Sequence, residues 1–333
     1  MGLNFAKPSV TADDLKTYKR DGVVQLKGVL SGTEIESLRR GVELQMRNAA
    51  TSASAYDFEE LQRQAFSEED LDIDVGRSDR FDIELLKLIV DTDPEARPIR
   101  DDINGKAGEG HARFFYDAAG WRHYEEIRSV ALDSALPSVV TELMDTTYTH
   151  FWEDNTFVKA PLTPQRTVFH QDWSYFQIEG EKACIVWIPL DPVDAENGRM
   201  EYVRGSHLWG RIYAPSIFFA QSANPVSPYD KLPDIEGNQE NYDIIGFDCQ
   251  PGDVIVHHVK TVHGSGGNIS KDRGRAAMSF RYCGDDIRYF DKPGAIEQQY
   301  LQGQLENGDR LHGPDYPLVL DKRKSNLNLF HTT

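Results

Sequence analysis

The chain has few cysteines, a deficit of basic charge and no long apolar run. Its 333 residues include only Cys184, Cys249 and Cys283, a scattered odd number that argues against a disulfide framework or zinc ribbon and predicts reduced thiols. Lys and Arg number 36 against 54 Asp and Glu, so the net charge of −18 disfavours nucleic-acid or anionic-membrane partners. No run of about 18 apolar residues and no signal-peptide pattern is found. A soluble, cytoplasmic protein that acts on small molecules is expected.

The absence of internal repeats and linkers predicts one domain over residues 1–333. The chain divides into three parts by pattern. Residues 1–146 are mostly helical in pattern and are expected to support the core. Residues 147–290 form the β-rich core, and residues 291–333 are a C-terminal extension. Residues 212–242 are rich in Pro, Asn, Ser and Asp and are too long for a simple connection. This stretch is therefore predicted to be a lid or binding loop.

Helical patterns dominate the first part of the chain. Thr11-Ala-Asp-Asp14 and Leu30-Ser-Gly-Thr-Glu34 each carry the capping signal that opens a helix. Residues 57–104 are acid-rich and mostly helical in pattern, and a further helix is expected over 121–144, interrupted near Pro137.

Short β-rich runs separated by turn residues follow from residue 147. This pattern is typical of a sandwich or barrel, so the fold class is mainly β with flanking helices, and the expected architecture is a jelly roll with a ligand-holding interior. The runs are Thr156–Lys159, Thr167–His170, Ala183–Ile188, Met200–Val203, Asp253–His257 and Ala276–Tyr282.

A pattern of two histidines and one aspartate is the most informative motif. His170 and Asp172, in Thr167-Val-Phe-His-Gln-Asp-Trp173, share one face of a strand, and His263 lies far downstream in Val262-His-Gly-Ser-Gly-Gly-Asn268. Two imidazoles and one carboxylate form the facial triad of non-haem Fe(II) oxygenases, which leaves about three coordination positions open. His257 and His258 are alternatives for the distal ligand.

An arginine after the distal histidine could hold a second ligand. Arg275 begins the strand that returns toward the barrel, and its planar fork suits the far carboxylate of a keto acid that chelates iron. Ser265 could add a hydroxyl donor, and Arg273 is the competing arginine. Three further residues could contact a carboxylate or be structural: Lys159, Asn155 and Gln165.

Aromatic and basic residues near the motif are candidates for a substrate pocket. Trp173 and Tyr175 are the preferred wall residues, although aromatics that flank a strand often belong to the core. Arg113, after a Gly-rich loop, could reach an anionic substrate or pair with a surface acid. His207 is expected to be structural.

The order and spacing of several motifs carry a family resemblance. The chain resembles the phytanoyl-CoA dioxygenase family, Fe(II)- and 2-oxoglutarate-dependent oxygenases built on a cupin-like double-stranded β-helix. One departure is Arg204, which stands where the family usually has Pro. The matching segments are Arg20–Leu26, Leu30–Ile35, His170–Asp172, Trp187–Asp191, Glu196–Gly198, Arg204–His207, Pro251–Asp253 and His263–Ser270, leading to Arg275.

The resemblance implies roles for individual residues. His170, Asp172 and His263 would bind Fe(II), Arg275 would hold 2-oxoglutarate with help from Ser265, and Trp187 would lie near that co-substrate. O2 would be consumed, succinate and CO2 released, and a C–H bond hydroxylated. Related halogenases lack the carboxylate ligand, so Asp172 favours hydroxylation, with desaturation or ring chemistry left open.

Two other functional classes remain open at the level of sequence. A noncatalytic jelly-roll protein could bind a metal or ligand for regulation, and a zinc hydrolase could also use two histidines and a carboxylate. Fold-level likeness does not identify the substrate, and the oligomeric state is undetermined.

Overall fold

The structure, a computed structural model, describes residues 10–52, 54–58, 113–216, 223–224, 226–295, 301, 303 and 305–327. Within these ranges the α-helices are α1 (Ala12–Asp21), α2 (Gly32–Arg47), α5 (Glu125–Asp133), α6 (Leu136–Leu143) and α7 (Lys322–Leu327). The 3-10 helices are η1 (Ala49–Thr51), η2 (Gly120–Arg122), η3 (Trp173–Tyr175), η4 (Ser206–Leu208) and η5 (Gln239–Asn241). No helix in the described part of the chain is long and apolar enough to cross a membrane.

The strands of the described ranges form a major sheet, a minor sheet and a small pair. The major sheet, in the order β1-β10-β7-β12-β4-β3-β2 with β14 on β4, contains β1 (Val23–Leu26), β2 (Tyr56–Asp57), β3 (Phe114–Ala118), β4 (Tyr148–Lys159), β7 (Ala183–Pro189), β10 (Val254–His258), β12 (Arg275–Cys283) and β14 (Leu318–Asp321). The minor sheet, in the order β5-β11-β8-β9, contains β5 (Thr167–His170), β8 (Met200–Val203), β9 (Ile244–Gly246) and β11 (His263–Ser265). The pair is β6 (Ile178–Glu179) and β13 (Arg288–Tyr289).

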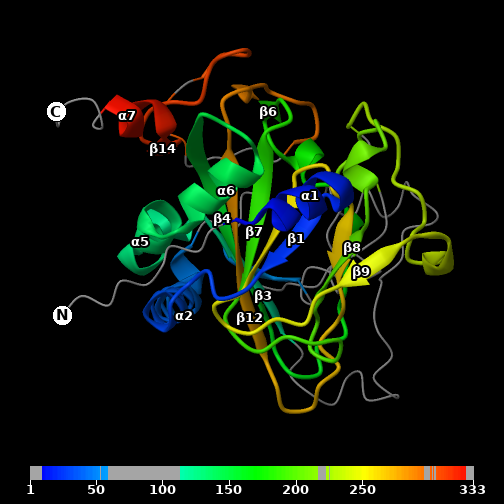
Figure 1. Cartoon of the computed structure of the whole chain (residues 1–333). Coiled ribbons are helices and arrows are strands. Elements are labelled where there is room, and N and C mark those ends of the chain that lie inside the picture. Colours follow the sequence, from blue (N-terminus) through cyan, green and yellow to red (C-terminus); the bar gives the residue numbers. More distant parts are fainter. Residues whose placement is uncertain are drawn as a thin grey trace.

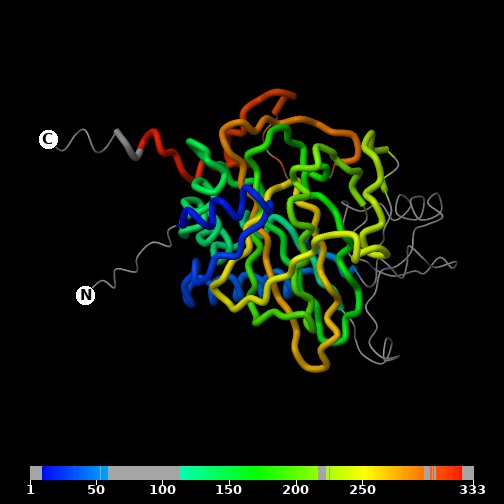
Figure 2. Tube along the Cα trace, turned by 45° about the vertical axis from the view of Figure 1, so that its right-hand side comes forward, coloured from blue at the N-terminus to red at the C-terminus, as the bar shows by residue number. Residues whose placement is uncertain are grey.

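Helices cover the outer face of the major sheet. Figure 1 shows α2, α5 and α6 on one side of the sheets and β8 and β9 on the other, and Figure 2 shows the same separation from a second direction. Leu38 and Ile127 of the helices belong to one buried apolar cluster with Val186 and Phe280 of the sheet. Burial of each such side chain contributes about 1.5–3 kcal/mol, so this layer anchors the sheet that carries the site.

Side-chain alternation gives the major sheet two different faces. Val186 of β7 and Phe280 of β12 point into the helix-covered core, whereas their neighbours Trp187 and Ser279 line a cavity on the other face. Neighbouring residues of a strand point to opposite faces, so one strand supplies both the core and the cavity.

The helix starts predicted from the sequence are confirmed. Thr11 and Ser31 are N-caps with complete capping boxes, in which Asp14 and Glu34 return hydrogen bonds to the cap backbones. Pro137 lies in the first turn of α6, where its missing N–H costs nothing, so two helices replace the single interrupted one that was expected.

The capping box of α2 allows a modest stability prediction. Ser31→Ala removes the acceptor for the Glu34 backbone N–H, 3.3 Å away, and should lower the free energy of unfolding by about 1 kcal/mol in urea denaturation. Ser129→Ala is the matched control, because this exposed hydroxyl bonds only to the Glu125 carbonyl of its own helix. An equal loss in both variants would contradict a specific capping role.

The predicted jelly-roll class is confirmed, with differences at its edges. The sequence patterns did not predict β3, which lies beside β4, nor β14, which brings the C-terminal part onto the same sheet. Residues 59–104, most of the acid-rich stretch predicted to be helical, lie outside the described residues. The described part of 212–242 contains η5 and one isolated bridge, Tyr213 with Asp230, and its role as a lid stays a prediction.

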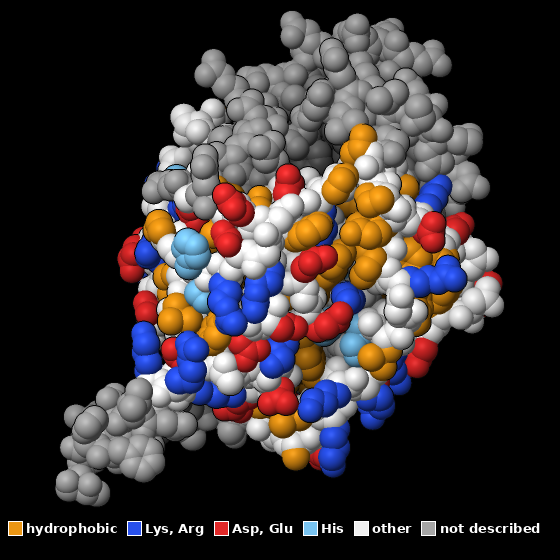
Figure 3. All heavy atoms as spheres, turned by 90° about the horizontal axis from the view of Figure 1, so that it is seen from above, with side chains coloured by type: hydrophobic (Ala, Val, Ile, Leu, Met, Phe, Trp, Pro, Cys, Tyr) orange, Lys and Arg blue, Asp and Glu red, His pale blue; other side chains and the backbone are white. Residues whose placement is uncertain are grey.

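Figure 3 shows one face of the molecule. Lys and Arg side chains are interspersed there with Asp and Glu, and no continuous basic surface covers this face. This distribution gives no support to a phosphate-backbone partner on the side shown.

Candidate metal centre and cavity

Strand register brings the two predicted histidine ligands together. β11 pairs antiparallel with β5, and His263 lies directly opposite His170. Directly opposed residues have Cβ atoms about 4.5–5.5 Å apart, and the two imidazole centroids are 4.3 Å apart. Residues far apart in the sequence thus meet because the minor sheet pairs their strands.

Backbone carbonyls orient both imidazoles. Nδ1 of His170 lies 2.8 Å from the Val168 carbonyl, and Nδ1 of His263 lies 2.9 Å from the Thr261 carbonyl. A carbonyl can only accept, so each Nδ1 carries the proton and each Nε2 keeps its lone pair. Both Nε2 atoms are therefore prepared to bind a cation.

Asp172 completes the cluster from the N-cap of η3. The prediction that it shares a strand face with His170 is wrong, because β5 ends at His170 and the Asp172 backbone is in the helical region. Its Oδ1 lies 3.7 Å from His170 Nε2 and its Oδ2 lies 3.6 Å from His263 Nε2. The candidate ligand atoms of the three residues all lie within 4.8 Å of one another, and all three residues are buried. Burial would raise the pKa of Asp172, but the surrounding histidines, His263 foremost, hold that pKa well below its usual value. The carboxylate is thus charged and ready to bind a metal ion.

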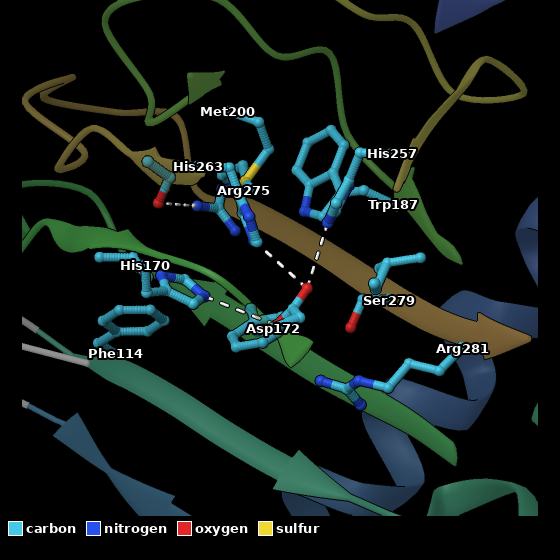
Figure 4. A pocket seen from close by; sticks show the side chains of 14 residues that line it. Phe114, His170, Asp172, Trp187, Met200, His257, His263, Arg275, Ser279 and Arg281 are labelled. Carbon is cyan, nitrogen blue, oxygen red and sulfur yellow. Dashed lines mark hydrogen bonds and ion pairs between the residues drawn. The ribbon is translucent and has the colours of Figure 1, made fainter. Parts of the chain in front are cut away.

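A third imidazole, that of His257 from the major sheet, lies against the cluster. Its Nε2 is 3.2 Å from Asp172 Oδ2, and a dashed line marks this contact in Figure 4. Its ring centroid is 4.3 Å from that of His263. Burial lowers the pKa of His257, so a neutral ring donates Nε2–H to the carboxylate. His258 lies on the opposite face of β10, with its ring 5.4 Å from that of His207. The structure thus gathers His263, rather than either alternative, into the three-residue cluster.

We expect His257 to hold the Asp172 carboxylate in place. His257→Phe keeps a ring but removes the donor, and loss of a partner to a metal ligand typically weakens metal affinity by about 10–100-fold. Competition with a chelating dye for Co(II) measures this change, and His258→Phe is the matched control on the other face of the strand. Unchanged Co(II) affinity in His257→Phe would contradict the positioning role.

A cavity lies between the two sheets beside this cluster. Residues of both sheets line it, so the candidate site lies in the jelly-roll interior. The lining residues are Phe114, Phe157, Thr167, His170, Asp172, Ile185, Trp187, Met200, His257, His263, Ser265, Arg275, Ser279 and Arg281.

Arg275 is a buried cation in the cavity wall. Only 2% of it is exposed, and Nη2 donates to the Gly198 carbonyl at 3.1 Å and to Ser265 Oγ at 3.5 Å. None of the described residues forms an ion pair with it, and its Nε has no hydrogen-bond partner among them. Burial lowers the pKa of Arg275 to about 10, so it remains charged at neutral pH.

These features fit both an iron ion and 2-oxoglutarate. The His-Asp-His donor set suits Fe(II). The buried guanidinium, which forms no ion pair within the described ranges, suits the distal carboxylate of a keto acid. Arg273, the competing arginine, instead pairs at the surface with Asp194 at 2.7 Å and Glu196 at 2.9 Å.

Lys159 contacts the serine rather than the cavity. Its Nζ lies 3.1 Å from Ser265 Oγ and 2.7 Å from the Gly266 carbonyl, and the residue is fully buried. Ser265 therefore links Lys159 to Arg275. The other two candidates bond elsewhere: Asn155 accepts from Arg281, and Gln165 donates to the Arg166 carbonyl at 2.7 Å.

The three residues predicted to bind substrate lie outside this cavity lining. Trp173 donates to the Gly180 carbonyl at 3.2 Å, Tyr175 donates to the Ser216 carbonyl at 2.6 Å, and its ring is 5.6 Å from that of His170. The Arg113 side chain is 49% exposed and forms an ion pair with Asp57 at 3.4 Å. Their contact with a substrate stays a prediction.

Several lining residues escaped the sequence-based prediction. Ser279 and Arg281 share a strand face with Arg275, so period-two spacing could have revealed them once Arg275 was chosen. Phe114 and Met200 reach the cavity only through the pairing of their strands with other strands. No sequence pattern marks either residue as part of the site.

A jelly roll whose interior gathers two imidazoles, one carboxylate and a buried arginine has the architecture of the non-haem iron oxygenase class. The model of one family, "Phytanoyl-CoA dioxygenase (PhyH)", matches residues 18–277. This chain belongs to that family, as the motif resemblance predicted.

Two curated proteins are similar over part of the chain. A probable phytanoyl-CoA dioxygenase of Caenorhabditis elegans is 25% identical over 143 residues, which cover 42% of this chain and 44% of that protein. A probable alpha-ketoglutarate-dependent hypophosphite dioxygenase of Stutzerimonas stutzeri is 30% identical over 111 residues, which cover 32% of this chain and 36% of that protein. Each match thus spans less than half of the relative's length.

Solved structures share the fold over nearly the whole chain. The non-heme alpha ketoglutarate dependent carbocyclase SnoK from nogalamycin biosynthesis is 22% identical with a TM-score of 0.62, covering 96% of this chain and 100% of that one. EctD from S. alaskensis, solved with 2-oxoglutarate and 5-hydroxyectoine, is 17% identical with a TM-score of 0.55, covering 93% of this chain and 88% of that one. At these identities the likeness establishes the fold alone.

Proposed function

We propose that this protein is an Fe(II)- and 2-oxoglutarate-dependent oxygenase that hydroxylates a C–H bond of a small organic molecule. The observation that carries the proposal is the buried Arg275 guanidinium, without an acidic partner among the described residues, in the same cavity as the His170, Asp172 and His263 cluster. The family and its alpha-ketoglutarate-dependent relatives support the same assignment.

Each of these side chains has a role that its position explains. His170, Asp172 and His263 would hold the metal from one side and leave its other positions to the cavity. Arg275 would hold the distal carboxylate of 2-oxoglutarate, and Ser265, fixed by Lys159, would donate a second hydrogen bond. When bound, iron and 2-oxoglutarate supply the oxidising power drawn from O2, with release of succinate and CO2.

The remaining walls control access to the centre. Phe114, Phe157 and Ile185 exclude water beside the metal site, which limits the loss of reactive species. Asp172 fills the position that a chloride ion would need, which favours hydroxylation over halogenation.

Oxygen-dependent release of succinate tests the proposal. Metal-free protein given Fe(II) and 2-oxoglutarate in air should form succinate above a protein-free control, and Zn(II) in place of Fe(II) should not support it. Absence of succinate from protein that binds both iron and 2-oxoglutarate would favour a noncatalytic binding protein. Hydrolysis supported by zinc but not iron would favour a metallohydrolase.

A further inference from the structure

Two hydrogen-bond donors of β12 face the cavity without partners. Ser279 and Arg281 are 5% and 7% exposed, and both line the cavity. Within the described part of the chain, Ser279 Oγ and Arg281 Nε make no hydrogen bond. Buried polar groups are normally satisfied, so these donors point to an acceptor supplied by a bound molecule.

The same donors lie far from the arginine assigned to the keto acid. Arg281 follows Arg275 by 281 − 275 = 6 strand residues, which places their backbones about 20 Å apart. Figure 4 shows the Asp172 carboxylate between the two arginines along the strand. A five-carbon diacid held by Arg275 and the metal ends before it reaches Arg281. The donors near Arg281 are therefore available to a second molecule.

Neighbouring residues fix the Arg281 guanidinium. Nη1 lies 3.4 Å from Glu153 Oε2, Nη2 donates to Asn155 Oδ1, and the guanidinium lies 4.7 Å from the Phe176 ring centroid. These contacts use one N–H of each terminal nitrogen, whereas Nε has no partner among the described residues. Burying an ion pair is costly, so the position of the Arg281–Glu153 pair in the cavity wall indicates a role in ligand binding rather than in stability alone.

The charges around the cavity favour a neutral hydrogen-bond acceptor on the second molecule. Among the described residues, three cations lie in or beside the cavity wall: Arg275, Arg281 and the buried Lys159. Three carboxylates offset them: Asp172, Glu153 and Asp191, whose charge acts on Arg275. A divalent metal ion offsets a doubly charged keto acid. A further buried anion would lack a counter-charge and would be costly, whereas a neutral carbonyl oxygen adds no charge. The cavity walls beside these donors are apolar and suit a hydrocarbon body, since Ile185 lies opposite Arg281 and Trp187 opposite Ser279.

We infer that the substrate is an uncharged molecule with an apolar body, anchored through a carbonyl oxygen that accepts hydrogen bonds from Arg281 Nε and Ser279 Oγ. This anchor holds one end of the substrate in the cavity that also contains the metal cluster. The inference rests on the proposed function, because it assigns the part of the cavity that the metal and keto acid leave free.

Matched aromatic probes test the anchor. Calorimetric titrations of the anaerobic protein–Fe(II)–2-oxoglutarate complex would compare acetophenone, ethylbenzene and benzoate. A hydrogen bond to a charged donor is stronger than one to a neutral donor, so acetophenone should bind at least about tenfold more tightly than ethylbenzene. It should also bind more tightly than benzoate, because only benzoate adds a charge.

Variants assign the preference to the two donors. Ser279→Ala, and Arg281→Met combined with Glu153→Gln so that no buried charge is left alone, should each reduce the preference for acetophenone to threefold or less. Ser174→Ala is the control, since its hydroxyl is also buried without a hydrogen bond but lies outside the cavity lining.

The outcomes separate this inference from the proposed function. Failure of the wild-type protein to bind iron and 2-oxoglutarate would overturn the proposed function and the inference together. If that complex forms but acetophenone shows no preference over ethylbenzene, including binding of neither probe, the carbonyl anchor is wrong. Tighter binding of benzoate than of acetophenone would show that the anchored group is a carboxylate and not a neutral carbonyl. A preference for acetophenone that persists in both variants would show that other residues anchor the carbonyl.

Discussion

His263→Ala should abolish iron-dependent succinate formation. The variant removes one of two imidazole nitrogens from a three-ligand site, and the cavity offers no nearby replacement except His257, whose Nε2 is bonded to Asp172. We expect formation of succinate to fall at least about 10³-fold, which corresponds to roughly 4 kcal/mol in the barrier. Iron retained after gel filtration and succinate formed per minute are the two measurements.

The fold should survive this substitution. The His263 side chain adds only one local hydrogen bond to the backbone, to Thr261, whereas the helix-covered core lies on the far face of the major sheet. An unchanged far-ultraviolet circular dichroism spectrum would show this directly. His258→Ala, on the same segment but outside the cluster, serves as control, and retention of iron and activity by His263→Ala would refute the ligand assignment.

Arg275→Gln should weaken 2-oxoglutarate binding while sparing iron binding. Removing one partner of a buried charge pair costs about 2–5 kcal/mol, so the KM for 2-oxoglutarate should rise by about 30-fold or more. Arg275→Lys keeps the charge but loses the planar fork, and an intermediate KM is expected. Steady-state assays with varied 2-oxoglutarate measure both variants.

The competing arginine provides the matched control. Arg273 is 39% exposed and is engaged by Asp194 and Glu196, so Arg273→Gln should leave the KM for 2-oxoglutarate within about twofold of wild type. A large rise in KM for Arg273→Gln with none for Arg275→Gln would reverse the assignment. Loss of iron affinity in Arg275→Gln would show that the arginine supports the metal site instead.

The sequence predicted the parts of this molecule that depend on local pattern. Capping signals at Thr11 and Ser31 marked helix starts, and alternating β-rich runs marked the strands of the jelly roll. The motif predicted that His170 and Asp172 lie together in one cluster, although the strand geometry assumed for Asp172 is wrong, since it caps η3.

Features that depend on long-range pairing could not be predicted in the same way. His257 meets Asp172 only because the fold brings β10 of the major sheet against the start of η3, and no local sequence pattern links the two residues. Phe114 reaches the cavity because β3 pairs with β4. The short sequence of β3 does not by itself specify this pairing. Ser279 and Arg281 could be recognised as candidate substrate-binding donors only after the structure placed them in the cavity wall.

The central claim is that His170, Asp172 and His263 hold one iron ion beside a 2-oxoglutarate bound by Arg275. Anaerobic titration of metal-free protein with Fe(II) and then 2-oxoglutarate tests it most directly. We expect one iron per chain and a weak visible charge-transfer band that saturates at one equivalent of 2-oxoglutarate and disappears in His170→Ala. Absence of the band in wild type, or an unchanged band in His170→Ala, would contradict the claim.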